Sequence, residues 1–247
     1  MSSREEIIRH WLLNLAVEVP IGLYRIFPEV ATQSLNVLEV PSCEATEYAD
    51  QLLELWDSGM IEISSEVPDD DVGSAVGVAK ILDRFLRLPS KSPSGVSKFP
   101  GHRRLPRHGR LLGTNVYFKL TRLGGATWEK LSEPCWSNYV WVLSDCSSGD
   151  ITSPNWDRVI AFLGWWSFIH PGEHVQPETI ECKTHDDFNL PYWKRFPRVY
   201  HASFRLRVSK GALTRWIHQY PQSLADWYRS VCSWYTEPWH LSGWPEE

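Results

Sequence analysis

Four residues in the second half of the chain have side-chain types that can bind a metal ion. His170 and His174 are four positions apart, and Cys182 and His185 are three apart. Imidazole nitrogen and thiolate sulfur are the usual ligands of tetrahedral zinc, so these spacings could converge on one ion. However, Pro171-Gly172 makes the first pair part of a turn, and the four spacings match no standard zinc module. We therefore expect a hydrogen-bonded surface histidine cluster, and a zinc-dependent enzyme remains a third hypothesis.

No other group of residues predicts catalysis. Asp186-Asp187 could act as paired carboxylates, but without a partner motif they are typical of a solvated turn. Phosphate-binding glycine loops, a Gly-x-Ser-x-Gly elbow and a His-Glu-x-x-His helix are absent from the sequence. A nucleophilic pair of Cys146 or Cys182 with any of nine histidines is too permissive to identify a site. We expect a protein that is not an enzyme, with no catalytic residue, no bound metal and no cofactor.

Apolar periodicity and capping residues predict the elements that would position functional groups. Ser3, followed by Glu5 and Glu6, is typical of the start of a helix, which Pro20 ends. Further helices are expected at residues 21–38 (one or two), 44–58, 72–88, from 124–125 through 131, from 153–154 through 163, 213–220 and 223–235. Strands are expected at 60–65, 115–120, 139–143 and 200–208, and a polar connection at 172–191. The predicted fold class is α+β, with domains at 1–138 and 139–247 packed together and an insertion at 66–114.

The predicted helix at 44–58 has two chemically different sides. Its apolar side carries Tyr48, Leu52 and Leu55. Five acids lie within an arc of about 140° on the other side, at about 100° per residue. These acids are Glu44, Glu47, Asp50, Glu54 and Asp57. Because such a face repels polyanions and attracts cations, we expect these five residues to bind a basic partner.

Charge is strongly segregated along the chain. Residues 1–83 contain 16 acids and 4 bases, whereas residues 84–128 contain 10 bases and no acid. Prolines, glycines and serines at 89–110 predict a mobile loop. Its candidates for contact with nucleic-acid phosphates are Lys98, Arg103, Arg104, Arg107 and Arg110. The same bases could instead bind a protein, remain solvated, or pair with the acidic helix of this chain.

Two motifs in the first half of the chain resemble a known module. They are Leu52-Leu-Glu-Leu-Trp-Asp-Ser-Gly-Met-Ile-Glu-Ile and Tyr117-x-x-Leu-Thr-x-x-Gly-x-x-x-Trp-Glu. In this order they resemble the winged-helix domains of the MarR and PadR regulator type, over roughly residues 1–138. In that type, a recognition helix ends at a glycine before the first wing strand, and the second wing strand ends at Leu-Thr-x-x-Gly. The resemblance implies an N-terminal winged-helix module with its recognition helix at 44–58.

This sequence departs from the winged-helix pattern in two ways. Its wing would run from about 66 to 114 and contain a helix, which is far longer than an ordinary hairpin tip. Its recognition helix would expose five acids and no base. DNA affinity comes largely from lysines and arginines that displace counterions from phosphates, so ordinary operator reading by this helix is not expected.

Together these features predict a cytoplasmic protein-binding module. The hypothesis is a bacterial immunity or antitoxin-like protein that neutralises a basic partner, such as a toxin or nuclease, through the acidic helix. The alternative is a DNA-binding transcriptional regulator that contacts phosphates through the basic wing. Five scattered cysteines without Cys-x-x-Cys and an acidic N-terminus predict the cytoplasm, and no apolar run approaches the ~20 residues of a membrane span. The partner's identity and the oligomeric state remain open.

Overall fold

The computed structural model describes residues 3–26, 44–66, 70–86, 116–145, 147–170, 172–209 and 234. The chain divides into two compact units, which are described separately below. Among the described residues, the first unit comprises 3–26, 44–66, 70–86 and 116–132, and the second comprises 133–145, 147–170, 172–209 and 234. The sequence predicts a domain boundary near residue 138. Within the described ranges, no helix is long and apolar enough to cross a membrane.

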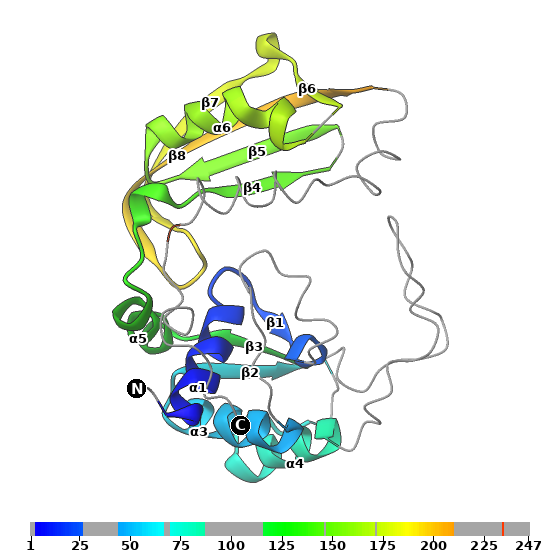
Figure 1. Cartoon of the computed structure of the whole chain (residues 1–247), viewed down its shortest axis with the longest axis vertical. Helices are drawn as coiled ribbons and strands as arrows, with labels where there is room; N and C mark the ends of the chain where they lie inside the picture. Colours follow the sequence, from blue (N-terminus) through cyan, green and yellow to red (C-terminus); the bar gives the residue numbers. More distant parts are fainter. Residues whose placement is uncertain are drawn as a thin grey trace. The chain divides into compact units, whose positions relative to one another are not determined.

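The first unit contains a small antiparallel sheet with helices around it (Figure 1). Its elements are α1 (Arg4–Leu15), β1 (Ile21–Gly22), η1 (Leu23–Ile26), α3 (Ala45–Asp57), β2 (Ile61–Ser65), α4 (Ala75–Leu86), β3 (Val116–Leu120) and α5 (Arg122–Ser132). The strand order is β1-β3-β2, so the strand that comes last in sequence lies in the middle. The helices and strands of both units confirm the α+β class.

Local capping explains why α1 begins at the predicted place. The Ser3 hydroxyl accepts a hydrogen bond from the Glu6 amide at 3.2 Å, and the Glu6 carboxylate accepts one from the Ser3 amide at 2.8 Å. This reciprocal capping box satisfies two amides that the helix leaves without an intrahelical partner. The buried side of α1 packs against α3, with the rings of Trp11 and Tyr48 5.3 Å apart.

The end of α3 and the start of α5 are joined by hydrogen bonds. Gly59 adopts a φ of +70° after α3, as predicted for a residue that terminates a helix, and Met60 N–H donates to the Leu55 carbonyl at 2.8 Å. The Thr121 hydroxyl donates to the Gly59 carbonyl at 2.7 Å and accepts from the Gly124 amide at 3.1 Å. A Cβ at Gly124 would lie 2.0 Å from the Met60 carbonyl oxygen. The two motifs that resemble a winged helix therefore contact each other.

The prediction of helix from residue 21 is wrong for Ile21 and Gly22, whereas residues 23–26 form the short 3-10 helix η1. Ile21 and Gly22 form β1, which pairs with Phe118 and Tyr117 of β3, and η1 follows. A short buried apolar run has no periodicity that separates strand from helix, and pairing with a distant strand decides its conformation. The remaining predicted helix at 27–38 lies outside the described residues.

The second unit is a twisted antiparallel sheet with a helix across one face (Figure 1). Its elements are η2 (Trp136–Asn138), β4 (Trp141–Ser144), β5 (Ser148–Ser153), α6 (Trp156–Ile169), β6 (Glu173–Val175), η3 (Pro177–Thr179), β7 (Glu181–Asn189) and β8 (Arg195–Val208). The strand order is β4-β5-β8-β6, and β7 also pairs with β8. Ile151, Ala202 and Phe204 of the sheet pack against Phe162 and Trp166 of α6.

The predicted polar connection at 172–191 is wrong because it contains β6 and β7. Every residue of β7 except the half-buried His185 is exposed, so its sequence has no alternation of apolar and polar residues. Pairing along β8 holds it in place, from Glu181 opposite Ser203 to Asn189 opposite Arg195. Asp186 and Asp187, expected in a solvated turn, lie on this strand, and both pair with arginines of β8 at 3.1 Å.

The other predicted elements divide into those that the structure confirms and those that it does not describe. The helices at 44–58, 72–88, 124–131 and 153–163 are confirmed as α3, α4, α5 and α6, although α6 extends to Ile169. The strands at 60–65, 115–120, 139–143 and 200–208 correspond to β2, β3, β4 and β8. The predicted helices at 213–220 and 223–235 lie outside the described residues, apart from Trp234.

Candidate functional site

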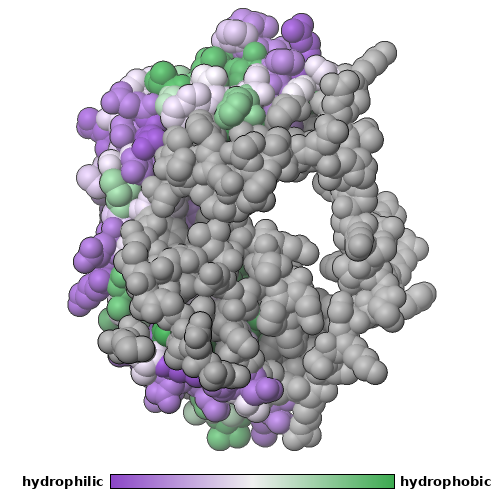
Figure 2. Space-filling view, in the orientation of Figure 1, coloured by the Kyte–Doolittle hydropathy of each residue, from purple (hydrophilic) through white to green (hydrophobic). Residues whose placement is uncertain are grey.

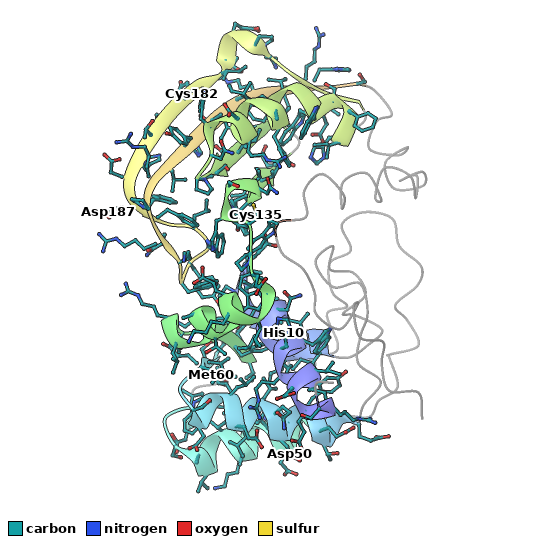
Figure 3. All side chains as sticks on the ribbon, turned by 60° about the vertical axis from the view of Figure 1, so that its left-hand side comes forward. His10, Asp50, Met60, Cys135, Cys182 and Asp187 are labelled. Carbon is teal, nitrogen blue, oxygen red and sulfur yellow. The ribbon has the colours of Figure 1, made fainter. Side chains whose placement is uncertain are left out.

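The acidic residues of α3 line its outward side. Glu44, Asp50, Glu54 and Asp57 are exposed, and Glu47 is half-buried. Figure 3 labels Asp50 on the outer side of this helix. On the opposite side Tyr48, Leu52 and Leu55 are buried against the rest of the first unit. The amphipathic pattern of the sequence therefore places all five predicted partner-binding carboxylates at or near the surface.

Two of the five carboxylates are held by arginines of α1. Arg4 Nε lies 3.0 Å from Glu47 Oε1, and Arg9 Nη2 lies 2.5 Å from Glu54 Oε2. Arg9 also donates to Gln51 Oε1 through Nε at 3.3 Å and Nη2 at 3.1 Å. These arginines cannot be identified as neighbours of α3 from the sequence alone, because their place beside α3 depends on how the two helices pack. The outward face is therefore a mixed one, with five carboxylates and two guanidinium groups.

The remaining three carboxylates form the uncompensated part of this face. Glu44, Asp50 and Asp57 make no ion pair with another described residue. The two arginine pairs are largely exposed, and surface pairs of this kind typically contribute less than about 1 kcal/mol. A cationic partner could therefore bind the three carboxylates that lack an ion pair and compete with Arg4 and Arg9 for the other two.

The predicted nucleic-acid-binding bases Lys98, Arg103, Arg104, Arg107 and Arg110 lie outside the described residues. Of the basic stretch at 84–128, two described members are bound to acids of the same unit. Lys119 Nζ lies 2.9 Å from Glu62 Oε2 across the β2–β3 pair. Arg84 forms a bidentate pair with Asp70 at 2.7 and 2.8 Å, and these hydrogen bonds lower the pKa of the Asp70 carboxyl.

The residues of the zinc hypothesis do not form one cluster. The described part of the chain contains no group of three or more histidine, cysteine or acidic side chains able to hold a metal ion. His170 stacks on Trp166 with ring centroids 4.5 Å apart, and burial lowers its pKa. His174 lies on β6, 3.5 Å from the Ser167 hydroxyl. Cys182 and His185 are three residues apart on β7 and therefore point to opposite faces of the sheet.

One row of polar residues in the second unit was missed by sequence analysis. His201 Nδ1 lies 3.0 Å from the Thr152 hydroxyl, and His201 Nε2 lies 3.3 Å from Asp150 Oδ1. These three residue types can form a nucleophile, base and orienting acid. Thr152 is only 6% exposed, however, and it lies directly opposite His201 in the β5–β8 register. Cross-strand pairing accounts for this row, so we assign it a structural role.

Comparison of the chain with protein-family models, with curated proteins and with solved structures returns no match. Among the surfaces considered above, the outward face of α3 has the clearest chemical preference. It offers carboxylate oxygens at regular helical spacing and accepts hydrogen bonds from cationic groups.

Proposed function

We propose that this protein is a cytoplasmic, non-enzymatic binding protein that holds a basic protein partner against the outward face of α3. The observation that carries the proposal is the set of three exposed, uncompensated carboxylates, Glu44, Asp50 and Asp57, on one helix face. Glu47 and Glu54 extend that face and exchange Arg4 and Arg9 for cations of the partner. The partner chemistry is a surface rich in lysine and arginine.

The physics of such a face supports rapid and selective capture of a cationic protein. Complementary charge raises association rates well above those of neutral surfaces, and salt weakens the effect. A basic toxin or nuclease fits this chemistry, because the carboxylates would occupy positions that nucleic-acid phosphates take on such a partner. The role would then be that of an immunity or antitoxin-like protein. The analogy is one of charge, so the chemistry of the partner is the part to test first.

The proposal is tested with a synthetic lysine-rich peptide as the probe. Fluorescence anisotropy at about 50 mM salt measures its affinity for the wild type and for the double variant Asp50→Lys, Asp57→Lys. The matched control is Glu178→Lys, Glu181→Lys, which changes net charge equally at exposed acids of the second unit. We expect at least a ~10-fold loss for the α3 variant, which corresponds to about 1.4 kcal/mol, and less than ~3-fold for the control. Equal losses in the two variants would show that binding follows net charge and not α3.

One structural observation favours a second candidate, a DNA-binding winged-helix regulator. The strand order β1-β3-β2 and the passage of α3 into β2 have the connectivity that the resemblance to winged helices implies. In this candidate β2 and β3 are the wing strands, and bases in residues 66–115 contact phosphates. Because α3 presents carboxylates where DNA presents phosphates and guanine acceptors, α3 itself would not read the major groove.

The same preparation separates the two candidates. Retardation of random duplex DNA that weakens steeply between about 50 and 200 mM salt supports the regulator. We expect that retardation to disappear in a variant with Arg103, Arg104, Arg107 and Arg110 changed to alanine, and to persist in Asp50→Lys, Asp57→Lys. No retardation at about 50 mM salt, together with peptide binding that depends on α3, supports the protein-binding proposal.

A further inference from the structure

Helix α6 of the second unit is apolar on nearly all sides. Its last eleven residues, 159–169, contain no charged residue. Val159, Phe162, Trp166 and Ile169 are buried against the sheet, as expected for one side of a surface helix. A helix that remains apolar on its other sides is typical of one that is covered in the assembled protein.

The side of α6 opposite the sheet exposes large apolar side chains. Ile160 is 48% exposed and Phe168 is 56% exposed, and both lie on the outward stripe 156-160-164-168. Trp156, at the start of the stripe, is 37% exposed. Hydrophobic residues reach the surface in this part of the second unit in Figure 2. Contiguous exposed apolar patches larger than a few hundred Å² commonly mark interaction sites.

A notch lies at the centre of this stripe. Gly164 is exposed, and a Cβ built on it would have no atom within 4 Å. Glycine is disfavoured in a helix interior relative to alanine, and no intramolecular contact in the described structure requires it here. A second helix that crosses α6 at this point could approach closely between the two projecting side chains, Ile160 and Phe168.

We propose that a second copy of this chain docks on the outward stripe of α6, with the two α6 helices antiparallel and crossing at Gly164. In that arrangement the residues that follow Gly164 in one copy lie opposite the residues that precede Gly164 by the same number of positions in the other copy. Phe168 then packs against Ile160 twice, once on each side of the two-fold axis. A two-fold symmetric contact requires this kind of self-complementary surface, in which each pair of contacting residues occurs twice.

The single charge on the outward side of α6 selects the direction of crossing. Asp157 lies in the first turn. In a parallel pair the two Asp157 side chains would meet, whereas antiparallel helices separate them by roughly 20 Å at 1.5 Å per residue. The antiparallel pair also places each Asp157 near the far end of the other helix, where the exposed His174 follows α6. A second copy therefore complements this face in shape, and the antiparallel arrangement keeps the two like charges apart.

The size of the stripe sets the expected strength of the dimer. A standard stable interface buries about 800 Å² on each partner, and three partly exposed side chains and their neighbours provide about half of that. We therefore expect a dimer that forms reversibly at tens of micromolar chain, in the weak range for protein pairs. This inference concerns the second unit and does not depend on the function proposed for α3.

Sedimentation equilibrium of the full chain between about 1 and 100 µM tests the proposal. We expect the wild type to pass from monomer to dimer in this range, and Phe168→Asp to weaken association at least ~10-fold. The matched control is Leu143→Asp, which removes a similarly exposed residue (53%) from β4. Loss of the dimer in Phe168→Asp but not in Leu143→Asp supports the α6 contact. A wild type that is monomeric throughout, or equal loss in both variants, overturns it.

A second variant separates a close helix crossing from non-specific apolar association. Gly164→Leu adds apolar surface and fits the monomer, because nothing lies within 4 Å of its Cβ. If the two helices cross at this position, the leucine blocks their approach and weakens the dimer at least ~10-fold. If association depends only on apolar area, Gly164→Leu strengthens it, and the proposed crossing is refuted. Unchanged far-UV circular dichroism in every variant confirms that folding is retained.

Discussion

The buried histidine of α1 offers the most direct test of how packing in the first unit controls its stability. His10 lies on α1 (Figure 3), is 5% exposed, and its Nε2 lies 2.7 Å from the hydroxyl of the buried Ser132 of α5. Burial lowers its pKa from 6.5 to about 4, since the charged imidazolium is poorly solvated in this site. At neutral pH the folded protein therefore contains a neutral His10 between α1 and α5.

The sign and size of the effect follow from the two pKa values. The unfolded chain takes up a proton near pH 6.5, and the folded chain takes it up only near pH 4. The contribution of neutral His10 to the free energy of unfolding is fully present above about pH 6.5. It decreases as the pH drops to about 4 and does not decrease further below that. A shift of this size corresponds to about 3 kcal/mol of unfolding free energy, at 1.36 kcal/mol per pKa unit.

Urea unfolding of the wild type and His10→Gln at several pH values measures this term. Glutamine keeps a side chain able to hydrogen-bond Ser132 and does not titrate, so every other titration cancels in the comparison. We expect the wild type to lose about 3 kcal/mol more than His10→Gln between pH 7 and pH 4, which shifts the urea midpoint by about 1 M or more. Equal losses in both proteins would refute the assignment of acid sensitivity to His10.

Three further substitutions test local packing. Gly124→Ala should destabilise the first unit by several kcal/mol, because its Cβ would lie 2.0 Å from the Met60 carbonyl; a thermal midpoint unchanged within error would contradict this. Gly164→Ala in α6 should stabilise the second unit by up to about 1 kcal/mol at chain concentrations near 1 µM, measured as a rise in Tm. Asp70→Asn should cost about 1–3 kcal/mol in denaturant unfolding, because Arg84 loses a charged partner that is only 6% exposed. Asp50→Asn, at an exposed residue of α3, serves as the control for Asp70→Asn.

The elements that sequence analysis predicted correctly are those whose limits are set locally. The helix expected at 44–58 corresponds to α3. Its end is predictable because Gly59 adopts a positive φ where the chain turns into β2. The start of α5 follows from Thr121, whose hydroxyl caps the helix. Both signals involve residues within a few positions of the boundary, so they can be read without knowledge of the tertiary structure.

The elements that sequence analysis missed are determined by distant partners. The two-residue strand β1 exists because β3, nearly one hundred residues later, offers a free edge. Strand β7 carries charged and polar residues on both faces, and its conformation follows from a long partner, β8. In both cases the local sequence is compatible with several conformations, and backbone pairing with a non-local strand selects one of them.

The same distinction applies to the candidate site. The positions of five carboxylates on one helix face follow from helical geometry, so sequence analysis could predict them. Their compensation could not be predicted, because Arg4 and Arg9 are 43 and 45 residues away from Glu47 and Glu54. A count of charges along the chain therefore overestimates the negative charge at the outward face of α3. With Arg4 and Arg9 included, the net charge of this face is −3 and not −5.

The two proposed surfaces depend on opposite physical forces, and this difference makes them separable in one molecule. The outward face of α3 acts through charge. Added salt shortens the Debye length and should therefore weaken the attraction of this face for a cationic partner. The stripe on α6 acts through apolar burial, which salts such as sulfate strengthen. If the α3 face and the α6 stripe are distinct sites, rising sulfate should weaken peptide binding while it strengthens self-association. A common response to salt would mean that one surface accounts for both.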